Sequence, residues 1–246
     1  SQAFPPDGND YVAIDAGYTH SLALRADGTL AGWGTPSKYK PVPEGNDYVA
    51  VAAGGDHSVA LTVDGRIVAW GGDNYFGETI PPNGNDFVAI AAGEHHSLAL
   101  RRDGTIVAWG DNKFGQATPP DGNDFVAIAS GERFGLAIKA DGSIVGWGQN
   151  DYGQATPPDG NDYVAVAAGD TYSLALKSDG TLVAWGRDAS GHSKPPDGND
   201  FTAIDAGISC NVALRSDGTV VAWNNPTAIR KTAPIDSNDY VLMVAG

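Results

Sequence analysis

The stretch that decides the fold is residues 92–110, AGEHHSLALRRDGTIVAWG. Two short, mostly apolar runs flank the dipeptide Asp103-Gly104, and the second run ends in Trp109. Asp-Gly between two such runs is a strong hairpin signal, and the form expected for it is a two-residue type I′ turn. Because no sustained helical periodicity runs through the stretch, it predicts paired strands and no helix.

The same pattern recurs along the whole chain. Each copy is a block of 25 residues that begins at an Asp-aromatic pair and ends just after a tryptophan, and the linkers between blocks have 12 to 14 residues. Because only the linkers vary in length, each block is predicted to be a fixed structural unit. These repeat cores span residues 10–34, 47–71, 86–110, 124–148, 162–186 and 200–224, and a seventh copy of the first strand alone stands at 239–246.

Each block predicts a three-stranded antiparallel sheet. In the fifth copy the strand runs are residues 163–168, 173–177 and 181–185. Six such sheets joined by Pro-rich linkers favour an all-β propeller over a sandwich, with residues 1–246 forming one domain. The first strand carries small side chains that suit the crowded inner rim, and the tryptophan suits the core between neighbouring blades.

The repeat also resembles a known family. The pattern Ala-Gly-x-x-His-Ser-Leu-Ala-Leu-x-x-Asp-Gly-Thr-x-x-x-Trp-Gly is clearest at residues 16–34 and 92–110, and the tails at 110–116 and 148–154 fit the same pattern. It resembles the regulator of chromosome condensation repeat over nearly the whole chain. In repeat length it is closest to β-lactamase inhibitory protein II, a secreted bacterial propeller that binds its enzyme target through loops on one face.

Two ways of closing the ring are compatible with the repeat count. Either six blades close and residues 239–246 add a strand at an edge, or a ring with seven positions lacks most of its last blade. The resemblance favours the curvature of a seven-bladed propeller, with six full repeats and a partial seventh.

Charge narrows the classes of partner. The chain has 30 acidic and 15 basic residues, which gives a formal net charge of −15. Such a surface repels phosphate backbones and anionic lipids, so we expect neither a nucleic acid nor a membrane as partner. No apolar run is long enough for a transmembrane helix, and no signal-peptide pattern opens the chain. The resemblance implies a bacterial protein that is extracellular or attached to the cell surface.

Two patterns invite a metal hypothesis. Histidines recur at one repeat position, but Phe, Tyr and Cys replace them in other copies, so packing or a local hydrogen bond explains the position better than coordination does. The position is held by His20, His57, His96, Phe134, Tyr172 and Cys210. The linkers of the type Pro-Pro-Asp-Gly-Asn-Asp are dense in oxygen donors but lack the ligand alternation of a calcium loop, so we expect ordinary turns and leave weak calcium binding open. No metal or cofactor is predicted.

No catalytic motif is present, and the chain is not predicted to be an enzyme. It has no Gly-x-Ser-x-Gly elbow, no His-Glu-x-x-His pair and no phosphate-binding glycine loop followed by lysine. The single cysteine, Cys210, excludes an internal disulfide, and its repeat position favours a structural role over that of a nucleophile.

The loops that follow the first and third strands of each block vary most, whereas the Asp-Gly hairpins hardly vary. In an up-down-up blade the two variable loops emerge at the same end, so they predict a binding face for a protein partner with a basic surface. Acidic residues in register predict an arc of negative charge, interrupted by Arg133 and Lys113, which could set the alignment of the partner. The predicted contact residues are Tyr18, Asp56, Glu94, His95, Glu132, Arg133, Asp170, Tyr75, Phe76, Lys113, Phe114 and Tyr152.

Other functions stay open at this point. An enzyme inhibitor resembling β-lactamase inhibitory protein II is a more specific function within the same class of non-catalytic protein-binding propellers. A hydrolase or lyase with its site in the central channel and a carbohydrate-binding or purely structural surface repeat are the alternatives from other classes. The sequence names neither the partner nor the oligomeric state.

Overall fold

The computed structural model describes residues 6–34, 41–188, 191, 193–208 and 210–224. Within them the chain forms six three-stranded antiparallel sheets in which each strand pairs with its neighbour in sequence. The all-β propeller with six full repeats is therefore confirmed. The predicted partial seventh repeat at 239–246 lies outside the described residues.

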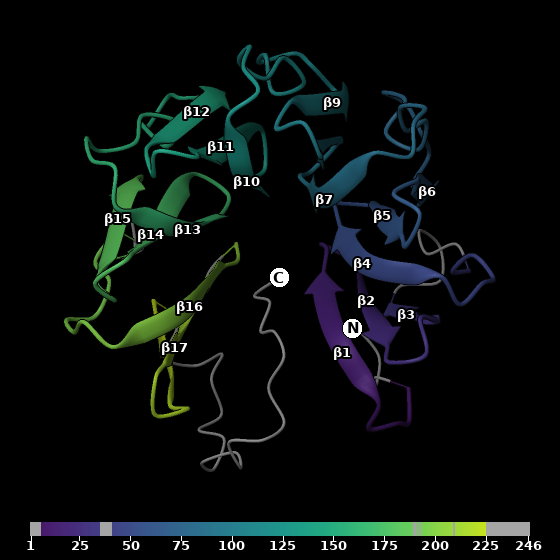
Figure 1. Ribbon diagram of the computed structural model, residues 1–246, viewed down its shortest axis with the longest axis horizontal. Helices are drawn as coiled ribbons and strands as arrows, with labels where there is room; N and C mark the ends of the chain where they lie inside the picture. The colour runs from purple at the N-terminus through teal and green to yellow at the C-terminus, as the bar shows by residue number, and fades with distance from the viewer. Residues whose placement is uncertain (1–5, 35–40, 189–190, 192, 209, 225–246) are drawn as a thin grey trace.

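The first strand of every sheet lies nearest the centre of the molecule (Figure 1). These inner strands are β1 (Tyr11–Ala16), β4 (Tyr48–Ala53), β7 (Phe87–Ala92), β10 (Phe125–Ser130), β13 (Tyr163–Ala168) and β16 (Phe201–Ala206). The middle strands are β2 (His20–Arg25), β5 (His57–Thr62), β8 (His96–Arg101), β11 (Phe134–Lys139), β14 (Tyr172–Lys177) and β17 (Asn211–Arg215). The outer strands are β3 (Leu30–Gly34), β6 (Ile67–Gly71), β9 (Ile106–Gly110), β12 (Ile144–Gly148), β15 (Leu182–Gly186) and β18 (Val220–Trp223).

The six described sheets follow an arc, and no described strand lies between β16 and β1 (Figure 1). Each of the other inner strands packs beside the inner strand of the next sheet. The six blades therefore turn through less than a full circle, so the angular step between neighbouring blades is smaller than in a closed ring of six. This agrees with the expected curvature of a seven-bladed propeller.

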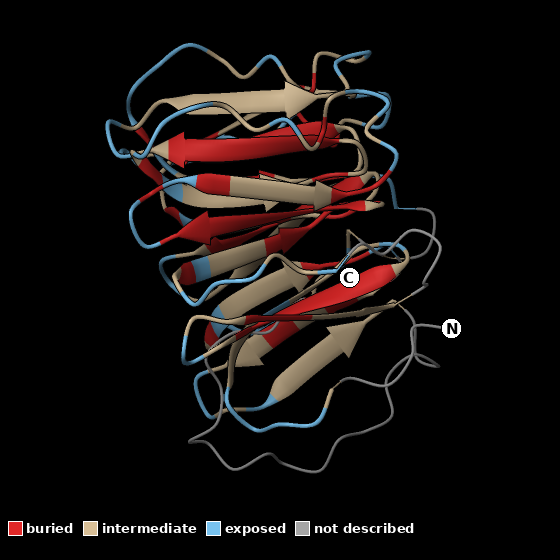
Figure 2. Cartoon of the chain, turned by 90° about the vertical axis from the view of Figure 1, so that its right-hand side faces the viewer, coloured by how far each residue is buried: buried red, intermediate tan, exposed pale blue. Residues whose placement is uncertain are grey.

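The core lies between neighbouring blades. Trp147 of β12 packs with Leu98 and Leu100 of the preceding blade, and its indole N–H donates to the Gln116 carbonyl oxygen at 3.0 Å. The middle strands of the first five blades are almost wholly buried, and exposure is concentrated in the loops (Figure 2). Trp109 and Trp185 donate to linker carbonyls in the same way, so in these three blades the tryptophan is a packing residue whose indole N–H is satisfied by the linker. The indole N–H groups of Trp70 and Trp223 are buried without such a partner among the described residues.

The Asp-Gly hairpins have a different turn from the one expected. The Gly28 amide donates to the Arg25 carbonyl and the Arg25 amide to the Thr29 carbonyl, which makes a loop of three residues. Gly28 has a φ of 81°, but Asp27 does not have positive φ, whereas a type I′ turn requires it at both central positions. The two-residue prediction was therefore wrong. The turn is of type I with a glycine bulge, and Asp27 accepts hydrogen bonds from the Thr29 amide and hydroxyl.

The histidine position links each blade to the next. His57 Nε2 lies 2.7 Å from Ser97 Oγ, and His20 Nε2 lies 2.8 Å from Ser58 Oγ. The ring lies against the glycine that ends the first strand of its own blade, because a Cβ added at Gly54 would overlap the His57 ring. The Ala-Gly-x-x-His motif therefore builds the blade junction through packing and a local hydrogen bond, as expected.

The last acid of each linker, which begins the next block, has a basic partner. Lys177 Nζ lies 3.2 Å from Asp162 Oδ2 and 5.3 Å from the centroid of the Tyr163 ring. The same arrangement of acid, base and aromatic ring recurs in the other blades, for example with Asp86, Arg101 and Phe87. These carboxylates are neutralised by side chains of their own blade, which favours the turn interpretation of the linkers over calcium binding.

Candidate binding face and its central hollow

The loops after the inner strands form a continuous chain of hydrogen bonds from blade to blade. The Glu94 amide donates to the Glu132 carbonyl oxygen at 3.0 Å, and the Glu132 amide donates to the Gly169 carbonyl oxygen at 3.3 Å. The loop after an outer strand joins the same end, because the Gln149 amide donates to the Arg133 carbonyl oxygen. The two variable loops therefore meet at one end of the propeller, as the sequence predicts.

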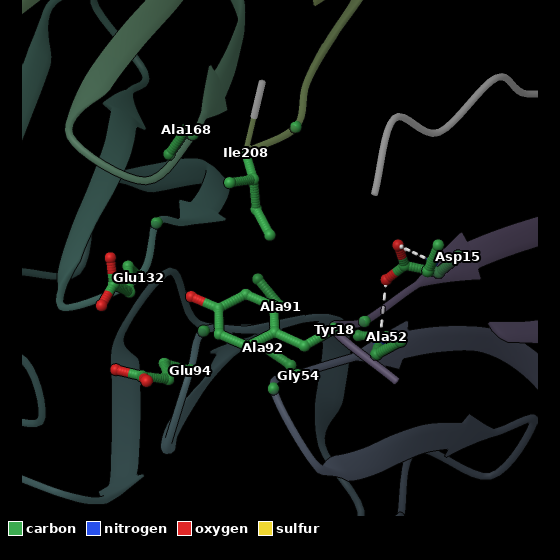
Figure 3. Close-up of a pocket in the computed structure, with 18 of the residues that line it drawn as sticks. Asp15, Tyr18, Ala52, Gly54, Ala91, Ala92, Glu94, Glu132, Ala168 and Ile208 are labelled. Atoms are coloured by element: carbon green, nitrogen blue, oxygen red, sulfur yellow. Dashed lines mark hydrogen bonds between the residues drawn. The ribbon is translucent and has the colours of Figure 1, made fainter. Parts of the chain in front are cut away.

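These loops surround a hollow of about 220 Å³ at the centre of the propeller. Its lining combines glycine and alanine backbone with acidic side chains drawn from blades one, three, four, five and six. The acids are Asp15, Glu94, Glu132, Asp170 and Asp205, and no lysine or arginine is among the described residues that line the hollow. Figure 3 shows Tyr18 reaching across the hollow, with Glu94 and Glu132 on one side and Asp15 on the other.

Tyr18 is held in an acidic environment. Its side chain is about half exposed, with a relative accessibility of 43%. Partial burial raises the pKa of its hydroxyl above the ordinary value, and the charges of Glu94 and Asp170 raise it further. The phenol is therefore neutral at physiological pH and presents a hydrogen-bond donor beside the carboxylates.

Arg133 has a different role from the one predicted. Its Nε lies 3.0 Å from Glu94 Oε2, and its Nη2 lies 3.0 Å from Glu132 Oε1. Sequence reasoning made Arg133 an interruption that would repel a wrong alignment, but the structure shows it clamping two acids of neighbouring blades. The clamp fixes both carboxylates and lowers the negative charge at this part of the hollow.

Aromatic side chains of the linkers after β6, β9 and β12 lie beside the loops that follow the inner strands. Phe76 packs against His95 of the next blade with ring centroids 5.3 Å apart. The guanidinium carbon of Arg133 lies 5.6 Å from the centroid of the Phe114 ring. Tyr152 lies 4.9 Å from the guanidinium of Arg187. Phe76, Tyr152 and especially Tyr75, at 81% exposure, offer apolar area to solvent. Lys113 is exposed and lies 5.5 Å from the Phe114 ring centroid.

The predicted contact residues therefore fall into two groups. Tyr18, Glu94, Glu132 and Asp170 line the hollow, and the linker aromatics form the outer group. Asp56 does not line the hollow, because it stands one repeat position after the acids that do: Gly55 aligns with Glu94, and Asp56 aligns with His95. Its Oδ1 accepts a hydrogen bond from Thr19 Oγ1 at 3.2 Å. The predicted register of four acids was therefore wrong at the second blade, and the acidic arc begins at Glu94.

Sequence reasoning missed Asp15 and Asp205, which lie on the inner strands themselves. Asp15 accepts hydrogen bonds from the amides of Ala16 at 2.7 Å and Ala53 at 2.8 Å. Burial raises its pKa to about 6 against the lowering effect of these bonds. The signal was visible in the sequence, because the same repeat position holds alanine in the four blades between them.

The described residues contain no helix that is long and apolar enough to cross a membrane. They also contain no group of three or more His, Cys, Asp or Glu side chains that could hold a metal ion. The side chains that line the hollow offer charge, hydrogen bonding and aromatic contact.

Six repeated three-stranded blades around an acidic hollow define a β-propeller of short repeats. The sequence matches the family described as Regulator of chromosome condensation (RCC1) repeat at residues 11–39, 48–78, 87–116, 125–154 and 163–191. These matches cover more than half of the chain, which therefore belongs to the regulator of chromosome condensation repeat family.

Solved structures agree on the fold. The ectodomain of the Physcomitrella patens receptor kinase CR4 is similar with a TM-score of 0.75 and 23% identity, over 86% of this chain and 62% of that chain. Prp20p from Saccharomyces cerevisiae gives a TM-score of 0.74 and 21% identity, over 87% and 71%. Human WBSCR16 gives 0.74 and 19%, over 89% and 77%. The present chain thus spans less than two thirds of the receptor ectodomain.

No curated protein sequence matches the chain. The expected closeness to β-lactamase inhibitory protein II is not confirmed by these comparisons.

Proposed function

We propose that the protein is a non-catalytic binding propeller that holds a protein partner on the face around the central hollow. The observation that carries the proposal is the hollow itself, whose described lining residues include five acidic side chains and no basic one. Arg133 beside the hollow offsets part of this charge through its ion pairs with Glu94 and Glu132. Negative groups gathered in a concave site concentrate their potential, which attracts a cationic partner and speeds its association.

The surroundings of the hollow suit a protein better than a free ion. The exposed rings of Tyr75, Phe76 and Tyr152 lie outside the acids and offer anchoring area of the kind found in protein interfaces. We infer that the partner presents a lysine- or arginine-bearing segment to the hollow and apolar side chains to these rings. The extracellular location stays a prediction from the sequence.

Related propellers support binding as the general role. Prp20p has binding properties to Gsp1p and histones, and Kap60 has been seen bound to yeast RCC1 (Prp20). Prp20p shares the fold with the present chain at only 21% identity, so its partners are not transferred.

The test compares two variants that remove the same number of charges from opposite ends of the propeller. In the first, called the hollow variant, Glu94, Glu132 and Asp170 of the hollow and the nearby loop residue Asp56 are changed to Asn or Gln. In the control, Asp27, Asp103, Asp141 and Asp179 of the exposed hairpins are changed to Asn, which keeps a carbonyl acceptor for the adjacent hydroxyl.

The probes are synthetic peptides of equal length whose net charge runs from acidic to basic and which do or do not carry an aromatic residue. Binding is measured by fluorescence anisotropy at several salt concentrations. We expect basic, aromatic peptides to bind wild type and the hairpin variant alike, and to associate more slowly and with a flatter salt dependence on the hollow variant. Equal binding by both variants would refute the proposed site, and binding independent of peptide charge would refute the proposed partner class.

A further inference from the structure

At one position of the inner strand, the first and sixth blades carry a different type of residue from the four blades between them. The next-to-last residue of the inner strand is Asp15 in the first blade and Asp205 in the sixth. In the other four blades this residue is Ala52, Ala91, Ala129 or Ala167. A carboxylate therefore stands only at the two blades that border the opening in Figure 1.

Asp15 shows what this carboxylate does where the inner strand of the next blade is present. Its Oδ1 accepts from the amide of Ala16, the next residue of its own strand, at 2.7 Å. Its Oδ2 crosses to the second blade and accepts from the Ala53 amide at 2.8 Å. Figure 3 shows Asp15 with hydrogen bonds of this kind at the edge of the hollow. One side chain thus joins two inner strands.

Asp205 makes only half of this arrangement. Its Oδ1 accepts from the Ala206 amide at 2.8 Å, which matches the bond from Asp15 to Ala16. Its Oδ2 is buried and has no hydrogen-bond partner. A buried carboxylate oxygen without a donor is destabilising, and burial together with the nearby Asp15 charge raises the pKa of Asp205 well above its ordinary value.

A second contact joins each blade to the next at the opposite end of the inner strand. The hairpin glycine carbonyl accepts from the amide of the aromatic residue that begins the next inner strand. The five pairs are Gly28 with Tyr48, Gly65 with Phe87, Gly104 with Phe125, Gly142 with Tyr163 and Gly180 with Phe201, at 3.1 to 3.2 Å. The equivalent carbonyl of the sixth blade belongs to Gly218, and no such bond to it is seen among the described residues.

The sequence after the sixth blade carries both missing donors at the required spacing. In the second blade the two donor amides belong to Tyr48 and Ala53, five positions apart. In residues 239–246 the equivalent positions are Tyr240 and Ala245, also five positions apart. These residues lie outside the described part of the chain, so the argument rests on the acceptors and on the repeat register.

We propose that the open side of β16 binds one further inner strand and that residues 239–246 of this chain form it. The Ala245 amide donates to Asp205 Oδ2, and the Tyr240 amide donates to the Gly218 carbonyl oxygen. The strand then lies between Asp205 and Asp15 and separates the two carboxylates that border the opening.

The test is residue-resolved amide hydrogen exchange of the full chain by NMR, in wild type and in two matched variants. Asp205→Ala should make the Ala245 amide exchange at least about tenfold faster and leave the Ala53 amide unchanged. Asp15→Ala should do the reverse. Asp205→Asn, which keeps an oxygen acceptor, should retain part of the protection and guards against a variant that fails to fold.

Three results would overturn the proposal. The amides of Tyr240 and Ala245 could exchange in wild type at the rate of an unstructured chain. Their protection could be insensitive to Asp205→Ala, which would separate the strand from this carboxylate. Protection could also depend on protein concentration and be accompanied by a dimer in light scattering, which would make a second copy the donor of the strand.

Discussion

Acid should weaken the blade junction that His57 builds. His57 is 1% exposed, and burial lowers its pKa from 6.5 to about 4. Below pH 6.5 the unfolded chain therefore takes up a proton that the folded protein does not, until the pH approaches the folded value. The stabilisation from this neutral ring is complete above that range and falls by about 2 kcal/mol between pH 7 and pH 5.

The assay is urea unfolding at both pH values of wild type and His57→Phe, since phenylalanine fills this repeat position as Phe134 in the fourth blade. The variant leaves Ser97 without its partner, and this costs about 1–3 kcal/mol at either pH. Asp15 acts in the opposite direction, because its raised pKa makes the folded protein bind a proton first and gain stability as the pH falls from 7 to 5.

The comparison of variant with wild type removes the contribution of Asp15, which both proteins share. We expect the unfolding free energy of His57→Phe to fall by about 2 kcal/mol less than that of wild type between the two pH values. Parallel pH profiles, within about 0.5 kcal/mol, would show that the imidazole is solvated or protonated in the folded state and would refute the reasoning.

Two further predictions concern a blade junction and the hollow. Gly131→Ala should cost about 2–3 kcal/mol in urea unfolding because the new Cβ would overlap the Phe134 ring, whereas Gly153→Ala should cost about 1 kcal/mol because it meets open space and only the φ of 79° is unfavourable. Equal losses would mean that the ring moves aside. Arg133→Gln should tighten the binding of basic peptides and steepen its salt dependence, since it frees Glu94 and Glu132. Weaker binding would instead show that the clamp positions the loops.

The blades could be predicted from the sequence because the same pattern of strand and turn residues occurs in six copies. A tryptophan, an Asp-Gly pair and a thin first strand at fixed spacing leave one arrangement in which each blade buries its faces. The turn type was missed because Asp-Gly also serves a three-residue loop, in which only Gly28 needs positive φ. A local sequence pattern therefore predicts the position of a turn better than it predicts the type of the turn.

The site was harder to predict because its decisive contacts join blades that are distant in sequence. The aromatic and acidic loop residues were found by their variation, but the ion pairs of Arg133 with Glu94 and Glu132 depend on how adjacent blades are rotated. Asp56 stands one position after the acids of the other loops, since Gly55 aligns with Glu94, and its carboxylate faces Thr19. The departure from alanine at Asp15 and Asp205 was readable, but its meaning needed the geometry of the junction.

The contact between a hairpin glycine and the next inner strand has a consequence for how such a chain changes in length. Because the same two backbone atoms meet at every described junction, removing residues 125–162 would bring the Gly104 carbonyl to the Tyr163 amide in place of the Phe125 amide. The deletion spans 38 residues, the spacing of Trp109, Trp147 and Trp185. Gene duplication or loss can therefore add or delete a blade without inventing a new interface, provided that it acts on whole repeats.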